Sequence, residues 1–356
     1  MFIFDGIERL TSVYIMLGAA CNMRCRHCIE VKMPRLKKTI SSDVLSYLKE
    51  LTSKKKLKLV FFGGEPLLYK DQMQEIINVI HPQTYVTIIT NGLLLNNDIV
   101  NWINDNNIAV AFSNDGPNTD KTGRNNLLED PEFCKIFSRI KHRGIEGVIH
   151  AYSQDFEETF KYFYSKIPDA SIYMGDLVVT HSCPDDYVDF DPTILRKNED
   201  LIIKHVNNMV TGKEFDPFLV DLVMRKAKIL NTRASGRLKD GFACGVIGHT
   251  INIDLQGNIF LCHACDIKLG TIYEPLNDLM DKSNQVSENI RLNFLDSKGC
   301  NACEARDFCA GKCPLEPPSK NQHKGCEAVI SLWRAVDKSI KVFGDYLNDS
   351  NECKME

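Results

Sequence analysis

The chain has 356 residues, which is enough for about two domains of ordinary size. Its 43 Lys and Arg residues nearly balance 47 Asp and Glu residues, so the formal net charge is only −4. This balance gives no basic surface for nucleic acid or for an anionic membrane, and neither is expected as a partner. No apolar run approaches the ~20 residues of a membrane span, and Asp5 and Glu8 interrupt the N-terminus where a signal peptide would lie. We therefore expect a soluble, cytoplasmic protein.

Short apolar runs rich in β-branched and aromatic residues recur in the first half of the chain, as is typical of buried parallel strands. Six strands are predicted, at Val13–Leu17, Leu57–Phe62, Tyr85–Thr90, Ile108–Ser113, Ile145–His150 and Ile172–Val179. Helical periodicity separates them at Ser42–Leu51 (with Ser41 as N-cap), Asp71–Ile80, Asp98–Asn106, Glu132–Arg143 and Phe156–Lys166. This α/β alternation predicts a parallel sheet, either an open partial barrel or a doubly wound sheet.

The pattern changes after Pro192, where two long helical stretches run to about Arg233 without a following strand. Ala234-Ser-Gly236 indicates a break, so we expect one domain over 1–235, with bridging helices from about 192, and a second over 236–356. The second region is predicted to hold a hairpin of Thr250–Asp254 and Asn258–Leu261, a cysteine-rich segment and an amphipathic helix at Ala328–Tyr346.

The fourteen cysteines are the unusual feature of the composition. In a reducing cytosol, clustered cysteines are better interpreted as metal ligands than as disulfides. Cys21, Cys25 and Cys28 directly follow the first strand, at the edge where parallel α/β folds place their chemistry. Three thiolates leave one coordination position open for water or substrate. The alternative is a zinc site with a distant fourth ligand, such as His27.

The loops after the next three strands carry residues suited to a small polar ligand. They read Gly63-Gly-Glu-Pro66, Thr90-Asn-Gly92 and Ser113-Asn-Asp-Gly-Pro117, and Arg124 follows shortly after. Paired glycines let the backbone approach a ligand, and a carboxylate can accept hydrogen bonds from an ammonium group. Each loop alone is compatible with ordinary turn chemistry, but together they indicate a binding site on one rim.

With these motifs the chain resembles the radical S-adenosylmethionine (SAM) enzymes, which fold as partial (β/α)6 barrels. The resemblance implies that Cys21, Cys25 and Cys28 ligate a 4Fe-4S cluster whose free iron chelates SAM. It also implies that the 63–65 loop engages the SAM amino group, while a guanidinium suits its carboxylate. The full implied cofactor-binding set is Gly63, Gly64, Glu65, Pro66, Asn91, Ser113, Asp115, Arg124 and His27.

A second cysteine group lies near the C-terminus, at Cys244, Cys262, Cys300, Cys303, Cys309, Cys313 and Cys326. Its spacing alone suits one or two zinc sites equally well. The arrangement also looks like the SPASM extension of radical SAM enzymes, which carries two auxiliary 4Fe-4S clusters, making three in all. That resemblance implies an inner cluster on Cys244, Cys262 and Cys313, and an outer one on Cys300, Cys303, Cys309 and Cys326. Cys265 is the candidate fourth inner ligand; the alternative is an iron left open for substrate. Cys134, Cys183 and Cys353 receive no ligand role.

The resemblance implies an enzyme that cleaves SAM reductively to a 5′-deoxyadenosyl radical, which abstracts hydrogen from a peptide. We favour a ribosomal-peptide maturase forming a thioether or carbon–carbon cross-link. The alternatives are formylglycine formation in a sulfatase, peptide epimerisation, a small-molecule substrate, or a non-catalytic iron–sulfur or zinc protein.

Sulfatase-maturing enzymes carry an Asp base after the inner-cluster cysteine, whereas here His263 follows Cys262, which counts against the sulfatase alternative. His263 itself is the candidate catalytic base. An unperturbed imidazole pKa near 6.5 suits that task, although a structural histidine is the alternative. A flavodoxin or ferredoxin is expected as reductant. Only twelve residues precede Val13, so any leader-peptide recognition is expected from a separate protein or from the domain surfaces.

Overall fold

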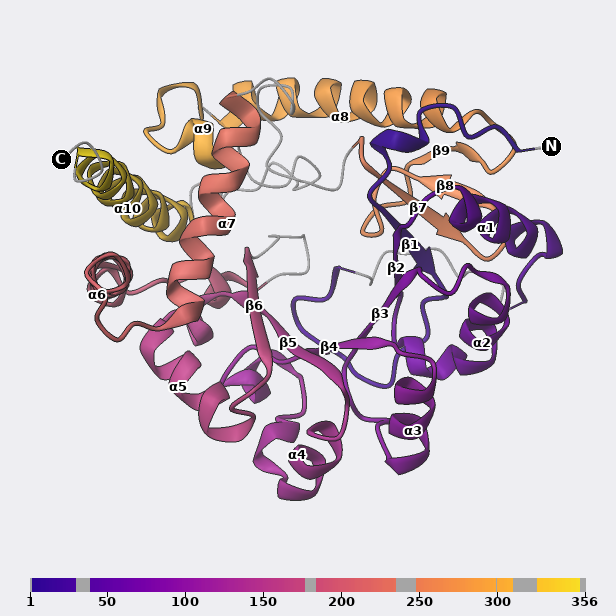
Figure 1. Ribbon diagram of the computed structural model, residues 1–356, viewed down its shortest axis with the longest axis horizontal. Helices are drawn as coiled ribbons and strands as arrows, with labels where there is room; N and C mark the ends of the chain where they lie inside the picture. Colours follow the sequence, from indigo (N-terminus) through magenta and orange to yellow (C-terminus); the bar gives the residue numbers. More distant parts are fainter. Residues whose placement is uncertain are drawn as a thin grey trace.

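The computed structural model describes residues 2–29, 39–176, 184–234, 248–298, 300–309 and 325–352. Cys183, Cys244, Cys313 and Cys353 lie outside these residues, as does the end of the sixth predicted strand. Figure 1 shows the strands as an arc at the centre of the molecule, with helices along its outer side.

The first half of the chain forms six parallel strands in consecutive order. They are β1 Ser12–Met16, β2 Lys58–Phe62, β3 Tyr85–Thr90, β4 Ala109–Ser113, β5 His142–Ile149 and β6 Ser171–Asp176. The helices between them are α1 Ser42–Lys54, α2 Lys70–Val79, α3 Asn97–Asp105, α4 Pro131–Phe137 and α5 Phe156–Lys166. Because each strand pairs with the next along the chain, the fold is a partial (β/α)6 barrel and the doubly wound alternative is wrong.

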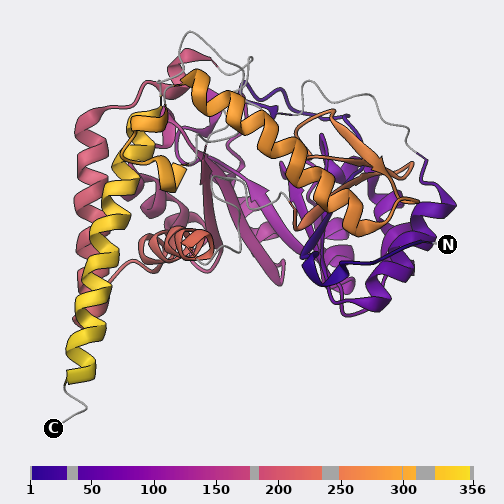
Figure 2. The same cartoon turned by 90° about the horizontal axis from the view of Figure 1, so that it is seen from above.

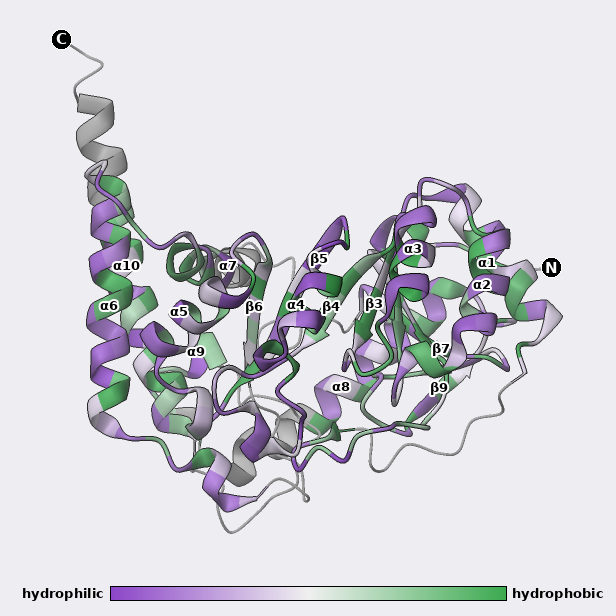
Figure 3. Cartoon of the chain, turned by 90° about the horizontal axis from the view of Figure 1, so that it is seen from below, coloured by the Kyte–Doolittle hydropathy of each residue, from purple (hydrophilic) through white to green (hydrophobic). Residues whose placement is uncertain are grey.

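Local sequence fixes where these helices begin. Ser41, Asn96 and Asp155 each accept a hydrogen bond from a backbone N–H of the following turn, as N-cap side chains do. The outer surfaces of α2 and α3 are hydrophilic, while hydrophobic residues gather where helices meet strands (Figure 3). The predicted N-cap at Ser41 is confirmed.

The predicted helix over Glu132–Arg143 is wrong in its second half. Helix α4 ends at Phe137, and β5 already begins at His142. Arg143 Nη1 donates to the Ile140 carbonyl (2.6 Å), and its strand position pairs with Val110 of β4. Sheet pairing is a tertiary interaction, and here it overrides the local helical periodicity.

The second region extends the same sheet. Strand β7, Thr250–Asp254, pairs in parallel with β1 over its whole length, from Ser12 opposite Thr250 to Met16 opposite Asp254. Strands β8 Asn258–Phe260 and β9 Lys268–Thr271 follow antiparallel, so the described sheet has nine strands in the order β6-β5-β4-β3-β2-β1-β7-β8-β9. The predicted hairpin is confirmed, and Gly257, with φ +82°, forms its turn. Sequence reasoning missed β9.

The remaining helices surround the open side of the barrel. They are α6 Pro192–Val210, α7 Pro217–Ala234, α8 Leu276–Lys298, α9 Arg306–Cys309 and α10 Cys326–Glu352. Figures 1 and 2 both show α8 spanning the molecule between β9 and α9, above the strands. Sequence reasoning missed α8, whereas the predicted C-terminal amphipathic helix is present and longer than expected.

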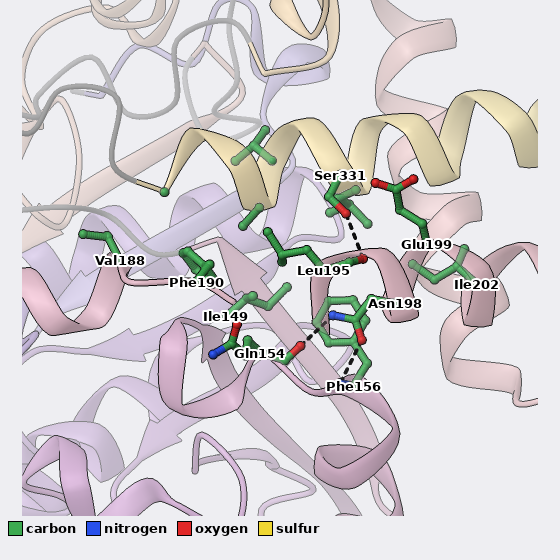
Figure 4. Close-up of a pocket in the computed structure, with 14 residues that line it drawn as sticks. Ile149, Gln154, Phe156, Val188, Phe190, Leu195, Asn198, Glu199, Ile202 and Ser331 are labelled. Carbon is green, nitrogen blue, oxygen red and sulfur yellow. Dashed lines mark hydrogen bonds between the residues drawn. The ribbon is translucent and has the colours of Figure 1, made fainter. Parts of the chain in front are cut away.

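Helix α10 packs along α6, and a small cavity remains between them (Figure 4). The Ser331 hydroxyl on α10 donates to the Leu195 carbonyl (3.0 Å), and Asn198 Nδ2 on α6 donates to the Gln154 carbonyl (2.6 Å). The cavity measures about 40 Å³. That volume holds a few water molecules, so this gap is too small for a cofactor.

The N-terminal segment, residues 3–9, forms hydrogen bonds that hold the start of α8 against the barrel. The Ile3 carbonyl accepts a hydrogen bond from Leu276 N (3.0 Å). Arg9 Nη1 lies 2.7 Å from both Asn277 Oδ1 and Asp281 Oδ1 on the first turns of α8. Within the described ranges, no helix is long and apolar enough to cross a membrane.

Strand β1 carries the packing of both regions, because it has a neighbour on each side. We expect Ile15→Ala to lower the free energy of unfolding by about 2–5 kcal/mol, since Ile15 is fully buried between β2 and β7. Chemical denaturation measures this loss. Leu68→Ala is the matched control, because Leu68 is 46% exposed and its loss is expected to stay within about 0.5 kcal/mol. Equal effects of the two changes would contradict the central place of β1.

Candidate active site

The loop after β1 places three cysteines on one cavity at the carboxyl end of the strands. Cys21, Cys25 and Cys28 all line this cavity, which measures about 360 Å³. It is lined by Tyr14, Cys21, Met23, Cys25, His27, Cys28, Ile29, Phe62, Gly63, Gly64, Ile89, Asn91, Ser113, Arg124, Glu146, Gly147, Val148, Tyr173, Gly175 and His263. Most of the sequence-predicted rim is thus brought together, from segments more than 200 residues apart.

The paired glycines lie directly against the cysteine loop. Gly64 N donates to the Gly18 carbonyl (2.7 Å), and a Cβ on Gly64 would lie 2.3 Å from the Ala20 carbonyl oxygen. Gly63 has φ +141°, and a Cβ there would lie 2.5 Å from the Gly18 carbonyl oxygen. We expected the glycines to give a ligand room; the structure shows that they also let two loops touch through their backbones.

Glu65 is turned away from the cavity and ties two loops together. Its carboxylate accepts hydrogen bonds from Leu67 N (3.0 Å), Thr90 Oγ1 (2.7 Å) and Asn91 N (2.8 Å). Burial raises the pKa of this carboxyl, against the hydrogen bonds, which lower it. Neither Glu65 nor the buried Pro66 lines the cavity, so both support the loop that does.

Asn91 and Ser113 reach the cavity from the ends of β3 and β4. Asn91 Nδ2 donates to Asn22 Oδ1 (2.7 Å), and it lies 3.7 Å from Cys21 Sγ. Leu93 N donates to Asn91 Oδ1 (3.0 Å), which fixes the orientation of the amide. The Asn91 side chain, which we expected to contact SAM, therefore also links the end of β3 to the cysteine loop.

Asp115 forms a buried charge centre behind the cavity. Its Oδ2 lies 3.1 Å from Arg124 Nε, 3.8 Å from His27 Nε2 and 3.7 Å from His150 Nε2, and its Oδ1 accepts from Val148 N (3.0 Å). Burial acts to raise the pKa of this carboxyl, but Arg124 and His150 outweigh it and hold the pKa well below its usual range. Asp115 itself does not line the cavity, so it positions Arg124, which does.

His27 lies beside both Arg124 and Asp115. Its Nε2 is 3.3 Å from Arg124 Nη2, and its Nδ1 is buried without a hydrogen-bond partner in the described part of the chain. Burial lowers the pKa of His27 to about 4, so its ring is neutral near pH 7. A neutral Nε2 can accept the Arg124 N–H.

His263 enters the cavity from the second region. Its ring stacks on Tyr14 of β1, with centroids 4.9 Å apart and an interplanar angle of 14°, and meets the edge of Phe62 at 4.4 Å. Burial lowers the pKa of His263 to about 4, and its Nδ1 has no hydrogen-bond partner among the described residues. The pairing of β7 with β1 brings it there, which only the three-dimensional fold reveals.

The candidate auxiliary ligands are only partly described. Cys265 N donates to the Cys262 carbonyl (3.4 Å), and Cys303 N donates to the Cys300 carbonyl (3.1 Å), so each pair lies in one tight turn. Cys309 ends α9 and Cys326 begins α10. In the described ranges, no three His, Cys, Asp or Glu side chains converge where a single metal ion could bind.

Cys134, which received no ligand role, packs against the core from α4. Several cavity residues were missed by sequence reasoning, chiefly Tyr14, Phe62, Ile89, Glu146, Val148 and Tyr173. They lie on strands, and in β1, β3 and β5 they alternate with buried residues, so a period of two in the sequence was the available signal.

Residues 15–167 match the family model of the Radical SAM superfamily. The chain contains a radical SAM domain. That superfamily uses SAM and a 4Fe-4S cluster, and the relatives described below include a radical SAM enzyme. The residues present fit such a cluster, because three thiols share one cavity with the Arg124 guanidinium. Burial raises the pKa of the Cys25 thiol, and the charge of Arg124 acts in the opposite direction.

Two curated relatives match most of the chain. It is 24% identical over 341 residues to the radical SAM cyclopropyl synthase TigE of Paramaledivibacter caminithermalis, covering 86% of this chain and 68% of the relative. It is 23% identical over 358 residues to the serine-type anaerobic sulfatase-maturating enzyme of Bacteroides thetaiotaomicron. That match covers 85% of this chain and 82% of the relative.

Two solved structures share the fold. Native anSMEcpe with bound AdoMet superposes with a TM-score of 0.66 at 16% identity, covering 96% of this chain and all of the other. SuiB of Streptococcus suis bound to the precursor peptide SuiA superposes with a TM-score of 0.55 at 16% identity. The match covers 87% of this chain and 75% of SuiB.

Gly64 tests the contact between the loops. We expect Gly64→Ala to lower the free energy of unfolding by about 1–3 kcal/mol, because the added Cβ would overlap a backbone oxygen. Thermal unfolding and the iron retained per chain measure the effect. Gly175→Ala is the matched control, since its nearest neighbour would lie at an ordinary 3.4 Å. If Gly64→Ala behaved like Gly175→Ala, the loops would not depend on this close approach.

Asp115→Asn tests the buried charge centre. It leaves Arg124 without its anionic partner, so we expect a loss of about 3–5 kcal/mol in the free energy of unfolding at pH 7. The lowered pKa of Asp115 means that its stabilisation is complete above the unfolded value near 3.9 and is lost only as pH falls through the lower folded value. The loss should therefore be equal at pH 7 and pH 5.

Chemical denaturation at both pH values measures this loss. Asp120→Asn removes an exposed carboxylate from the same loop and should cost no more than about 0.5 kcal/mol. A loss for Asp115→Asn that grows between pH 7 and pH 5 would show that the folded pKa is raised rather than lowered.

Proposed function

We propose that this enzyme cleaves SAM reductively at a cluster held by Cys21, Cys25 and Cys28, and then abstracts hydrogen from a peptide substrate. The observation that carries this proposal is that the three thiols line one cavity together with the glycine loop, Asn91, Ser113 and Arg124. When bound, the cluster and SAM supply a radical able to abstract an unactivated hydrogen atom. The chain's own task is to bind, orient and exclude water.

The residues divide into those that contact SAM and those that hold the contacting groups. We assign direct contact to the Gly63 and Gly64 backbone, Asn91, Ser113 and Arg124, and place His27 beside them. A guanidinium can pair with the SAM carboxylate through two parallel hydrogen bonds. The positioning residues are Glu65, Pro66 and Asp115, because their carboxylates and ring lie behind the cavity lining.

The C-terminal part is proposed as a SPASM extension over 236–356, following a barrel domain over 1–235. Its two auxiliary 4Fe-4S clusters would accept the electron that an oxidative reaction releases, since cluster potentials are tuned by their surroundings. The proposed ligands are Cys244, Cys262, Cys265, Cys300, Cys303, Cys309, Cys313 and Cys326. The continuous sheet supports this role, because β7 and β8 lead to Cys262 beside the barrel cavity.

His263 is proposed as the base that takes a proton from the substrate. Its neutral imidazole lines the cavity with an unpartnered Nδ1, and the Tyr14 stack fixes the plane of the ring. A neutral ring nitrogen within the cavity can accept a proton, whereas a protonated one could not.

The proposed product is a thioether or carbon–carbon cross-link in a ribosomally made peptide. Two proteins of similar fold support a peptide substrate, since SuiB binds the precursor peptide SuiA and anSMEcpe binds the Cp18Cys peptide. Formylglycine formation is the second candidate, because the chain covers 82% of a sulfatase-maturating relative and matches anSMEcpe over its whole length. A flavodoxin or ferredoxin is the proposed reductant, and a separate leader-binding protein is a proposed partner.

Anaerobic reconstitution with iron and sulfide tests the proposal. We expect about twelve irons per chain, and 5′-deoxyadenosine on addition of dithionite and SAM. Changing Cys21, Cys25 and Cys28 together to Ala should remove about four irons and abolish cleavage. Cys134→Ala is the control, because that thiol packs in the core and should change neither value.

Cleavage that survives the triple change, or zinc in place of iron, would overturn the radical mechanism. Incubation with the Cp18Cys peptide bound by anSMEcpe separates the two candidate functions. Oxidation of that peptide's cysteine would favour the sulfatase-maturing reaction over the cross-link.

A further inference from the structure

Glu146 is a carboxylate in the cavity for which no role has yet been given. It lies on β5, directly between Ser113 of β4 and Tyr173 of β6 in the strand register. All three residues line the cavity. Among the described lining residues, Glu146 is the only carboxylate, since Asp115 and Glu65 lie behind the wall.

The Glu146 carboxylate has no partner within the described part of the chain. No hydrogen bond or ion pair there reaches either of its oxygens, although its backbone carbonyl accepts from Asn114 N (3.0 Å). Burial raises the pKa of Glu146, and Lys58 and Arg124 act in the opposite direction. Neither cation neutralises it, because Lys58 is exposed at the start of β2 and Arg124 is paired with Asp115.

The lining beside Glu146 is partly apolar, and one neighbouring strand position has no side chain. Val148 and Tyr173 flank the carboxylate on the cavity side, and Ile89 contributes to the same lining. Gly175 lies opposite Val148 in the register, and a Cβ there would meet nothing closer than the Tyr173 ring at 3.4 Å. A strand position without a side chain therefore leaves space beside the carboxylate.

A carboxylate in such surroundings is costly unless a partner compensates for its lost hydration. Within the described lining, Arg124 is the one guanidinium or ammonium group, and it is paired with Asp115. A cation arriving with the substrate would supply the missing charge and replace the lost hydrogen bonds.

We propose that Glu146 binds a cationic group of the peptide substrate, a Lys or Arg side chain or an amino terminus, inserted through the space above Gly175. This selects peptides that carry a positive charge near the residue to be modified. The inference rests on the proposed function for its peptide substrate, but it concerns binding alone and not hydrogen abstraction.

Ligand-observed saturation-transfer NMR on the reconstituted protein tests the proposal with two probes of similar length. Nα-acetyl-lysine amide carries the cation, and Nα-acetyl-norleucine amide is its neutral analogue. We expect the lysine probe to bind at least about tenfold more tightly, which corresponds to about 1.4 kcal/mol. Glu146→Gln should abolish that preference, and Glu146→Lys should reverse it in favour of Nα-acetyl-glutamate amide. Glu75→Gln, an exposed carboxylate on α2, is the matched control.

The same titration with SAM present distinguishes a substrate site from a cofactor site. We expect the lysine probe to bind the SAM-loaded protein with the same preference, whereas displacement by SAM would overturn the proposal. Equal binding of both probes to the unchanged protein would overturn it as well. So would a preference for lysine that survives Glu146→Gln. SAM cleavage measured in parallel reports on the proposed function separately, because it needs no peptide probe.

Discussion

The parallel pairing of β1 with β7 is the constraint on which the site depends. Strand β1 leads into the cysteine loop, and its other neighbour, β2, leads into the glycine loop. Because β7 lies on the free side of β1, the hairpin that follows carries His263 onto Tyr14 and Phe62. One ladder of backbone hydrogen bonds thus determines where residues from both ends of the chain meet.

Charge within the cavity wall is arranged in two layers. Asp115 and Glu65 lie behind the lining, where three or more groups of the chain compensate each carboxylate. Arg124 and Glu146 face inward, and only Arg124 has its counter-charge built in. Asp115 and Glu65, whose charges are fully compensated, make the wall rigid. Glu146, which is not compensated, is available to interact with a bound ligand.

Much of the fold was predictable because parallel strands and amphipathic helices leave strong periodic signals. All six barrel strands and the hairpin at Gly257 followed from apolar runs and turn residues. Strand β9 and the polar helix α8 were missed, since neither has a marked apolar pattern of its own. The cysteine loop was evident from spacing, whereas Glu146 required knowledge of which strand face turns inward.

The sheet also has a consequence for synthesis of the protein. On the ribosome, β1 and its cysteine loop emerge well over 200 residues before β7, so one edge of β1 stays unpaired throughout that interval. An exposed hydrophobic strand edge invites pairing with another chain. A cluster inserted early would sit in a loop whose final neighbours do not yet exist. The β1 edge is therefore exposed to wrong pairing until β7 has been synthesised.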